Sequence, residues 1–416
     1  MARLPKSPEF RFRMSLPPLT PEQSVKPPHF EARMSLLFAA IFVPMGFHLP
    51  YFPLWLEERG FDAAQVGLIL SAPIFVRLMA VPAITAFADR APDRAYVLIA
   101  LAAAALVASL GYFLPVGPVF VLSISLILSV VWSPHSPLAD SLALSGVRRY
   151  GSDYSRLRIW GTASFLAANL AGGAVLARFD AGVFPWLFSG GLAGIVVAAL
   201  FAPRLGRPRR PSQLPTDLPD ARRVLSDPYF LTIAFGCGSV IASHGFFYAF
   251  GSIYWKSLGI ASDTVGFLWA LMVLAEMFLF FVFRRLFSGF GVPAILAVCA
   301  GAAVVRWVAM PLVWPLGLGL AGFGVVQALH AFSTGLTMLG LQKMIAETIP
   351  EERTGAAQGI AFAANSGGMA VVTLASGPLY AYAGAVGFLA MAALSSVGLV
   401  LALAAYRLTP EGGRGR

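Results

Sequence analysis

The chain alternates between long apolar runs and short polar turns. Roughly 20 apolar residues cross the hydrocarbon core of a bilayer as a helix, and the runs have at least about this length. We therefore predict twelve membrane-spanning helices, at residues 35–56, 64–87, 95–113, 118–146, 156–177, 182–201, 229–255, 263–284, 291–311, 314–343, 354–380 and 383–406. The longest internal polar stretch follows the sixth run, where a linker between two six-helix halves is expected.

The expected fold is an all-α membrane protein of two pseudo-symmetric six-helix bundles. Its predicted parts are a disordered cytoplasmic tail at 1–33, bundles at 34–202 and 228–407, a cytoplasmic linker at 203–227 and a short cytoplasmic tail at 408–416. The first tail is polar and rich in proline, which is typical of disorder. It lacks the apolar core and small-residue cleavage site of a signal peptide.

An internal repeat supports the division into two halves. The stretch YFPLWLEERGFDAAQVGLILSAPIFVRL returns 199 residues later within HGFFYAFGSIYWKSLGIASDTVGFLWALMVLAEMFLFFVF. Gly60 aligns with Gly259, and Arg77 falls where Glu276 falls. The sequence thus predicts a duplicated chain with opposite buried charges at matched positions.

Composition and charge agree with a membrane protein. Charged residues make up 12% of the chain, against about 25% in soluble domains. If the N-terminus is cytoplasmic, 24 of the 30 lysines and arginines lie in cytoplasmic segments, three lie on the other side and three lie inside spans. This positive-inside distribution predicts that both termini are cytoplasmic, in a bacterial-type inner (plasma) membrane. It also explains the net charge of +10 without a nucleic-acid partner.

Glu276 and Arg306 lie on neighbouring spans, far from the ends of those spans. A charge at membrane depth costs at least about 2.5–3.5 kcal/mol and therefore requires a partner, a cavity or a proton. The two residues are predicted either as a static pair or as a pair that breaks when a proton or substrate arrives. Arg77 has no evident partner in its own half, so it either faces Glu276 or binds an anionic substrate.

Asp140 and Arg158 lie near the same end of two consecutive spans, so they are expected to pair. They form either a structural ion pair or a contact for a substrate carboxylate.

Histidines and aromatic residues gather on the first helix of each three-helix unit. His48, His135, His244 and His330 lie on spans one, four, seven and ten. A single such histidine is usually a packing residue, but histidine also suits proton relay, and His330 is the best candidate because it is expected to face Glu276. The aromatic side chains predicted deep enough to stack on a substrate ring are Tyr51, Phe247 and Tyr248, with His244 beside them.

The sequence contains no phosphate loop, metal-ligand spacing, nucleophile elbow or nicotinamide fingerprint. We therefore predict no enzyme, no cofactor and no metal. The two cysteines lie in apolar runs, which does not favour a disulfide framework.

Several stretches resemble the major facilitator superfamily, specifically the phenylpropionate permease family and more distantly the lactose permease family. They include FHLPYFPLWLEERGF, SPLADSLAL, DYSRLRIWG, VGFLWALMVLAEMFLF and VVQALH. In the lactose permease family, charges on spans four and five bind substrate, which would make Asp140, Arg158 and Trp160 substrate contacts. Residues on spans eight to ten couple the proton there, which would assign Glu276, Arg306 and His330 to coupling.

Two departures from these families stand out. In the tenth span no carboxylate follows His330 within one turn, and Ser333 and Thr334 occupy that place, which argues against a sugar substrate. The loop FADRAPDRAY is a degraded form of the Gly-rich Asp-Arg loop of the superfamily. Its Asp89 and Arg90 form either an inner gate or a helix cap with a positive-inside anchor.

The function predicted from these observations is proton-coupled symport of a small aromatic or other organic acid, by rocking of the two bundles of a monomer. The partners are a small-molecule substrate, a proton and the lipid bilayer. Symport of a sugar or nucleoside, or export, is the alternative within the same class. A membrane sensor or scaffold that does not transport is the alternative from another class.

Overall fold

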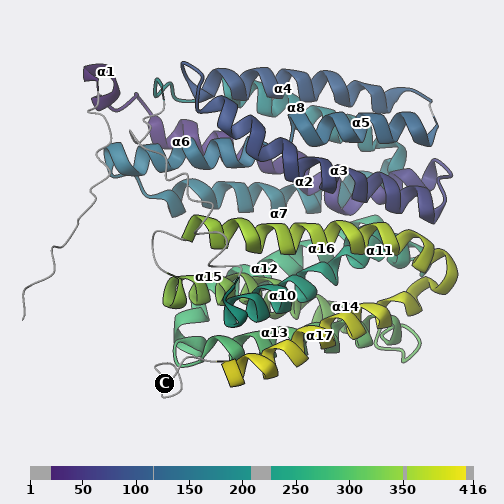
Figure 1. Cartoon of the computed structure of the whole chain (residues 1–416). Helices are drawn as coiled ribbons and strands as arrows, with labels where there is room; N and C mark the ends of the chain where they lie inside the picture. Colours follow the sequence, from purple (N-terminus) through teal and green to yellow (C-terminus); the bar gives the residue numbers. More distant parts are fainter. Residues whose placement is uncertain (1–19, 116, 208–225, 350–353, 409–416) are drawn as a thin grey trace, which may run out of the picture.

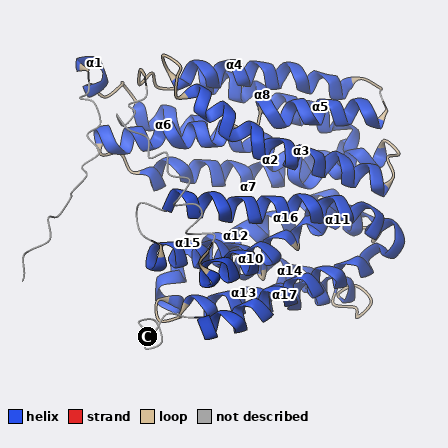
Figure 2. Ribbon diagram, viewed as in Figure 1, coloured by secondary structure: helices blue, strands red, loops and turns tan. Residues whose placement is uncertain are grey.

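The computed structural model describes residues 20–115, 117–207, 226–349 and 354–408, which form helices and connecting turns and contain no strand (Figure 2). The first half comprises α1 (Pro21–Ser24), α2 (Phe30–Glu58), α3 (Ala63–Ala88), α4 (Arg94–Ser109), η1 (Leu110–Phe113), α5 (Pro118–Val131), α6 (His135–Tyr150), α7 (Tyr154–Phe179), η2 (Ala181–Val183) and α8 (Phe184–Leu200). The second half comprises α10 (Pro228–Ala242), α11 (His244–Ser257), α12 (Ser262–Phe287), α13 (Val292–Leu312), α14 (Gly319–Ala328), the π-helix η3 (Ala331–Leu336), α15 (Thr337–Thr348), α16 (Thr354–Ala383), η5 (Gly384–Gly387) and α17 (Phe388–Leu408).

Eleven segments of the described chain are long and apolar enough to cross a membrane, and the last of them spans 357–408. That segment contains α16 and α17, and the chain reverses direction at η5 between them (Figure 1). The described residues therefore make twelve passes, as predicted. Some passes consist of two helices in line, such as α5 with α6 and α10 with α11.

The two halves lie side by side (Figure 1). Along the seam between them, α7 packs against α12 and α3 packs against α16. Glycines allow close backbone approach across this seam. A Cβ atom at Gly67 would lie 2.9 Å from the Cα atom of Gly377, and one at Gly266 would lie 2.4 Å from the backbone oxygen of Asn169. Gly67 and Gly266 are matched positions of the repeat, so both copies use the same residue to join the halves.

The turn after the first long segment of the repeat has the same conformation in both halves. Gly60 and Gly259 have positive φ angles of 79° and 80°, which glycine adopts without strain. In each copy the following residue donates its backbone N–H to the carbonyl five residues back, from Phe61 to Leu56 (3.1 Å) and from Ile260 to Trp255 (3.1 Å). These bonds close the helix ends in the same way.

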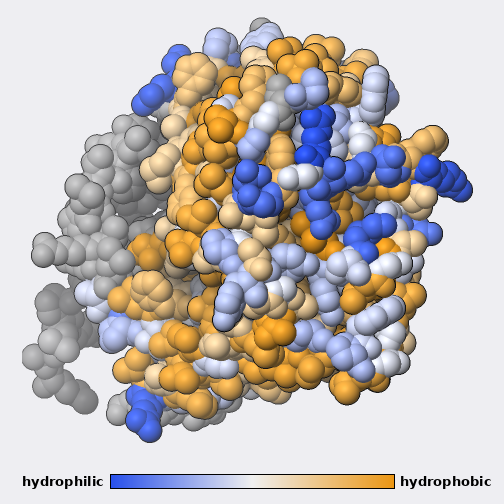
Figure 3. Space-filling view, turned by 90° about the vertical axis from the view of Figure 1, so that its right-hand side faces the viewer, coloured by the Kyte–Doolittle hydropathy of each residue, from blue (hydrophilic) through white to orange (hydrophobic). Residues whose placement is uncertain are grey.

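One end of the bundle is rich in arginine, and we call it the basic end. It is formed by the α3–α4, α6–α7 and α12–α13 connections and the helix ends beside them, which carry Arg90, Arg94, Arg148, Arg149, Arg284 and Arg285. Helix α1 and the end of α17 lie at this same end (Figure 1). Seen from the opposite end, hydrophilic residues lie across the middle of the surface between apolar flanks (Figure 3).

The prediction of a disordered tail at 1–33 was wrong for residues 20–33. Residues 20–33 include α1 and the first turn of α2. The side chain of Gln23 donates to the backbone oxygen of Arg207 (3.0 Å), and Arg33 donates to that of Ala202 (3.2 Å). These contacts hold the segment against the start of the linker. Residues 1–19, most of the predicted linker (208–225) and the end of the predicted C-terminal tail (409–416) lie outside the described residues.

Candidate functional site

Three of the four membrane-embedded histidines stand at breaks between helices. His135 begins α6 after the turn at Trp132–Pro134, and His244 begins α11 directly after Ser243. His330 precedes the π-helix η3. Breaks of this kind free backbone carbonyls near the membrane midplane, where transporters place their binding sites.

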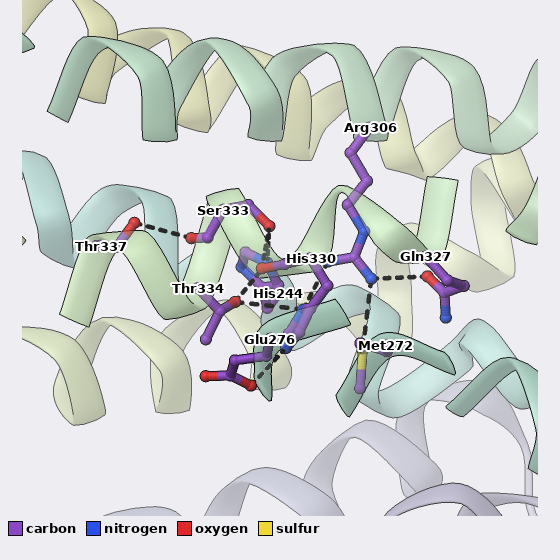
Figure 4. Close-up of polar contacts among 9 residues, drawn as sticks. All are labelled: His244, Met272, Glu276, Arg306, Gln327, His330, Ser333, Thr334 and Thr337. Carbon is purple, nitrogen blue, oxygen red and sulfur yellow. Dashed lines mark hydrogen bonds and ion pairs between the residues drawn. The ribbon is translucent and has the colours of Figure 1, made fainter. Parts of the chain in front are cut away.

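Arg306 is the centre of a polar network in the second half (Figure 4). Its side chain, from α13, is fully buried. Its Nη1 atom lies 3.0 Å from Nδ1 of His330, and its Nη2 atom donates to Oε1 of Gln327 at 2.8 Å. The guanidinium carbon also lies over the rings of Phe247 (5.0 Å) and Trp307 (4.5 Å). The positive charge is thus held by neutral acceptors and by cation–π contacts.

This contact determines the tautomer of His330. An arginine N–H group can only donate, so Nδ1 of His330 must accept. The proton of the neutral ring then sits on Nε2, which lies 3.9 Å from Oε2 of Glu276. A second proton on Nδ1 would face the guanidinium N–H, so the geometry favours Glu276 over His330 as the group that takes an additional proton.

His244 extends the network toward α11. Its Nδ1 atom lies 2.9 Å from the backbone oxygen of Val240 and therefore donates. Its Nε2 atom accepts from the hydroxyls of Ser333 (3.0 Å) and Thr334 (3.1 Å). The Thr334 hydroxyl also lies 3.3 Å from Nδ1 of His330, but its single proton is donated to His244, and that nitrogen of His330 already accepts from Arg306.

Glu276 occupies the open side of this network. Its side chain, on α12, is 20% exposed, and apart from His330 it has no ion-pair partner among the described residues. It faces the π-helix η3, where a Cβ atom at Gly335 would lie 2.8 Å from Cγ of Glu276. π-Helical turns inside α-helices frequently occur at functional sites.

The predicted direct pair between Glu276 and Arg306 is not formed. His330 lies between them, in contact with Arg306 through one nitrogen and nearest Glu276 through the other. The distance between Arg306 and Glu276 depends on how α12 and α13 are rotated about their axes, and the sequence pattern did not specify these rotations. The carboxylate is therefore available for a proton without first leaving the guanidinium.

In the first half, Asp140 and Arg158 come together as predicted. The Nε atom of Arg158 lies 3.9 Å from Oδ1 of Asp140, and the Tyr154 hydroxyl donates to the same oxygen at 2.9 Å. The Arg158 guanidinium also lies 4.0 Å from the ring centre of Phe42. Both charged side chains remain about one-third exposed, so each has room for a further partner. Trp160 is 56% exposed on the same helix.

Arg77 has no hydrogen bond or ion pair with any described residue. Its half-buried side chain lies on α3, close enough to His48 to interact with it electrostatically. His48 is surrounded by aromatic rings, with Phe52 stacked at 4.5 Å and Trp132 at 5.3 Å. The first half thus contains a cation without a partner among the described residues, and the second half contains a carboxylate whose one ion-pair contact there is neutral His330.

Two of the three aromatic residues expected to contact substrate are placed differently. Tyr51 is fully buried in the seam, and its hydroxyl donates to the backbone oxygen of Asn169. Phe247 is fully buried behind Arg306, so it stabilises the guanidinium instead of lining an open wall. Tyr248 is half-buried and stacks on Trp269 at 5.9 Å, and it alone of the three keeps an exposed part.

Asp89, which was predicted with Arg90 to form either an inner gate or a helix cap, is the C-cap residue of α3 and pairs with Arg94. Asp89 binds Arg94, whose Nη2 and Nε atoms lie 2.5 Å and 2.8 Å from its Oδ1 atom. Arg94 also donates to Ser145 of α6 at 3.4 Å. Asp89 therefore fixes the α3–α4 loop within the first half, and the Arg90 side chain has no hydrogen bond or ion pair with any described residue.

Sequence reasoning missed Gln327, Thr334 and Tyr154. Gln327 and Thr334 lie one helical turn before and after His330, so their positions on its face were available from the spacing. Polar uncharged residues in apolar helices carried too little signal to be singled out. Tyr154 was overlooked because it lies at the first turn of α7.

These features define a membrane transporter of the major facilitator type, with twelve passes in two pseudo-symmetric halves and a polar network buried between helices. The chain belongs to the MFS_1 like family, whose model matches residues 32–390. It is 26% identical over 354 residues to the "Probable 3-phenylpropionic acid transporter" of Escherichia coli (strain K12), covering 84% of this chain and 91% of that protein. It is 27% identical to the maltose permease of Geobacillus stearothermophilus over 281 residues, 66% of this chain and 69% of that one.

Among solved structures, a mutant of the nucleoside transporter NupG superposes with a TM-score of 0.80 at 15% identity, covering 92% of this chain and all of that one. This likeness concerns the fold alone. The family and these relatives are transporters, not enzymes.

Proposed function

We propose that this protein is a proton-coupled symporter of a small aromatic carboxylate, of the phenylpropionate kind. The observation that carries the proposal is a pair of opposite charges without a charged partner among the described residues, Arg77 in the first half and Glu276, which faces neutral His330, in the second. The substrate class is supported by the relative from Escherichia coli and by the exposed side of Tyr248 beside the network.

The two charges give a physical reason for coupling. An unpaired charge in apolar surroundings costs several kcal/mol, so the halves rock most easily when both charges are neutralised. A substrate carboxylate neutralises Arg77, and a proton neutralises Glu276. The empty transporter neutralises both when the two side chains approach each other. A carrier loaded with only one of the two ligands retains one bare charge, which disfavours uncoupled movement.

Arg306, His330 and Gln327 position the carboxylate in this scheme. Arg306 keeps the Nε2 proton of His330 directed at Glu276, so the ionised carboxylate has a neutral donor nearby but no permanent cation. Asp140 and Arg158 form a second polar contact nearer the basic end, where a substrate carboxylate can exchange with Asp140 on Arg158. We place the basic end in the cytoplasm of a bacterial-type inner membrane, with the monomer as the working unit.

The maltose permease relative favours a second candidate, proton-coupled sugar transport. The absence of a carboxylate at Ser333 and Thr334 argues against it.

The test is uptake into liposomes that contain the purified protein under an imposed pH gradient, acid outside. We expect labelled 3-phenylpropionate to accumulate above its external concentration and a protonophore to abolish the accumulation. Maltose and uridine serve as competitors and should not reduce uptake. In separate assays, accumulation of labelled maltose or uridine, but not of 3-phenylpropionate, would support a sugar or nucleoside transporter. If none of the three labelled compounds crosses the membrane, the protein transports none of these classes.

A further inference from the structure

A groove on the periphery of the first half lies outside the transport site. It runs between α3 and α4 near the basic end and has a volume of about 700 Å³. Its walls are apolar and include Ile84 and Phe87 from α3 and Val97 and Leu101 from α4. Helix α4 lies at the margin of the first half, away from the second half (Figure 1), so the groove does not belong to the seam between the halves.

Arg90 lines the groove at its basic end. Its side chain is exposed and has no hydrogen bond or ion pair with any described residue. The neighbouring carboxylate of Asp89 is already occupied by Arg94. Asp93 is occupied as well, because it accepts the backbone N–H groups of Ala95 (2.8 Å) and Gly206 (2.7 Å). The acidic groups beside the groove therefore leave the Arg90 charge uncompensated.

A second guanidinium lies near the same end. The Cζ atom of Arg204 is 5.2 Å from the ring centre of Tyr96, which also lines the groove. Arg204 donates to the backbone oxygen of Ala202 at 3.0 Å, which fixes it in this place. An apolar channel thus ends between two arginines and a tyrosine, at the basic end of the bundle.

We propose that this groove is a binding site for one anionic phospholipid, with an acyl chain between α3 and α4 and the phosphate on Arg90. The planar guanidinium fork matches phosphate oxygens, and basic pockets between membrane helices on the cytoplasmic side bind acidic lipid head groups. A zwitterionic head group would place its own cation beside Arg90 and Arg204, so the charge pattern selects a lipid with net negative charge. The tyrosine ring occupies the interfacial position typical of tyrosine.

Native mass spectrometry of the delipidated, detergent-solubilised full chain tests this proposal. Phosphatidylglycerol and phosphatidylcholine with identical acyl chains are added separately. We expect about tenfold more phosphatidylglycerol than phosphatidylcholine to remain bound. Arg90→Gln should lower phosphatidylglycerol retention about tenfold. Arg285→Gln is the matched control, because Arg285 is an exposed arginine at the same end on α12, and it should leave retention within twofold.

A second variant keeps the test decisive if Arg90→Gln folds poorly. Ala100→Trp fills the channel while leaving Arg90 in place, and it should abolish the preference for phosphatidylglycerol. Glycerol 3-phosphate, which has the phosphate but no acyl chain, should not displace the lipid at equal concentration. Equal losses in Arg90→Gln and Arg285→Gln, unchanged retention in Ala100→Trp, or displacement by glycerol 3-phosphate would each overturn the proposal.

Discussion

Arg306 and His330 lie side by side in the second half, with Nη1 of the arginine 3.0 Å from Nδ1 of the histidine. Because the guanidinium can only donate, this contact fixes the proton of the neutral imidazole on Nε2, toward Glu276. A buried cation thus sets the orientation of a neutral donor, and the donor faces a carboxylate with room for a proton.

The first prediction concerns Gln327, which accepts a hydrogen bond of 2.8 Å from Arg306. Gln327→Leu leaves a buried charged donor without its acceptor, which costs about 1–3 kcal/mol or more. We expect a lower thermal unfolding temperature in detergent, together with weaker proton-driven accumulation, because Arg306 loses the bond that fixes it against His330. Gln342→Leu removes an exposed glutamine from α15 whose two hydrogen bonds with Gln358 (2.6 and 3.3 Å) are open to water, so it should change stability by less than about 1 kcal/mol. Equal stability of the two variants would show that the Arg306 contact is not needed.

The second prediction concerns Glu276 and pH. Glu276→Gln cannot gain or lose a proton, so we expect substrate exchange across liposomes to persist while accumulation driven by a pH gradient is lost. Exchange by the unaltered protein should rise as pH falls, because the protonated carboxylate is needed, whereas exchange by the variant should not change with pH. Glu347→Gln removes an exposed carboxylate that pairs with Lys343 at 3.8 Å, and it should behave like the unaltered protein. Full accumulation by Glu276→Gln would remove this residue from the coupling mechanism.

The third prediction separates a structural role of Asp140 from a functional one. The pair with Arg158 is long, 3.9 Å, and about one-third exposed on both sides, so it contributes at most about 1 kcal/mol to stability. Asp140→Asn should therefore unfold at nearly the same temperature as the unaltered protein. If Arg158 binds the substrate carboxylate, removing its competitor should lower the KM severalfold, and Arg158→Gln should raise it at least tenfold. Calorimetry and initial rates of uptake measure the two effects separately, and unchanged KM values in both variants would contradict substrate binding here.

The fold could be predicted from the sequence because each pass leaves a long apolar run, and the repeat of Gly60 at Gly259 left an identical turn in both halves. The pairing of Asp140 with Arg158 was also predictable, since a short loop joins their helices. The contacts of Arg306 were not, because they depend on the rotation of α13 against α14 and η3. Apolar helices have little amphipathic pattern from which such rotations follow.

The packing role of Tyr51 was missed for a related reason. Its hydroxyl donates to the backbone oxygen of Asn169. A backbone carbonyl is present at every residue, so the sequence does not indicate which one accepts this bond. Likewise, the sequence placed Asp89 next to Arg90, but a loop of five residues allowed Asp89 to reach Arg94 instead. Polar groups in a membrane take the nearest partner in space, and proximity along the chain is a poor guide to it.

The fourth prediction concerns Gly335 in the π-helix. A Cβ atom there would lie 2.8 Å from Cγ of Glu276, so Gly335→Ala must displace the Glu276 side chain. Alanine normally stabilises a helix by about 1 kcal/mol relative to glycine. Any loss of stability or of transport in Gly335→Ala is therefore due to the clash with Glu276. We expect proton-driven accumulation to fall at least tenfold while the protein remains folded by thermal unfolding. Gly301→Ala, in α13 with nothing within 4 Å of the added methyl group, should transport normally. Normal transport by both variants would show that Glu276 tolerates displacement.

The fifth prediction concerns the end of the seam opposite the basic end. At Gly266 an added Cβ atom would lie 2.4 Å from both the backbone oxygen of Asn169 and the hydroxyl oxygen of Tyr51. Real Cβ atoms do not approach so closely, so Gly266→Ala must separate α12 from α7 and disturb the Tyr51 hydrogen bond. We expect backbone amides in residues 166–180 and 262–270 to exchange with deuterium about tenfold faster, because opening of this end becomes about 1.4 kcal/mol easier.

The matched control for this variant is Gly190→Ala, in α8, where nothing lies within 4 Å of the added atom. It should leave deuterium exchange in both segments unchanged. If the two halves rock as proposed, this end opens and closes, and Gly266→Ala should also raise the accessibility of the seam to a thiol reagent at an introduced Asn169→Cys. Unchanged deuterium exchange and unchanged thiol labelling in Gly266→Ala would mean that the contact at Gly266 does not hold the two halves closed. The contact between α3 and α16 at Gly67 and Gly377 would then be the one that closes the seam.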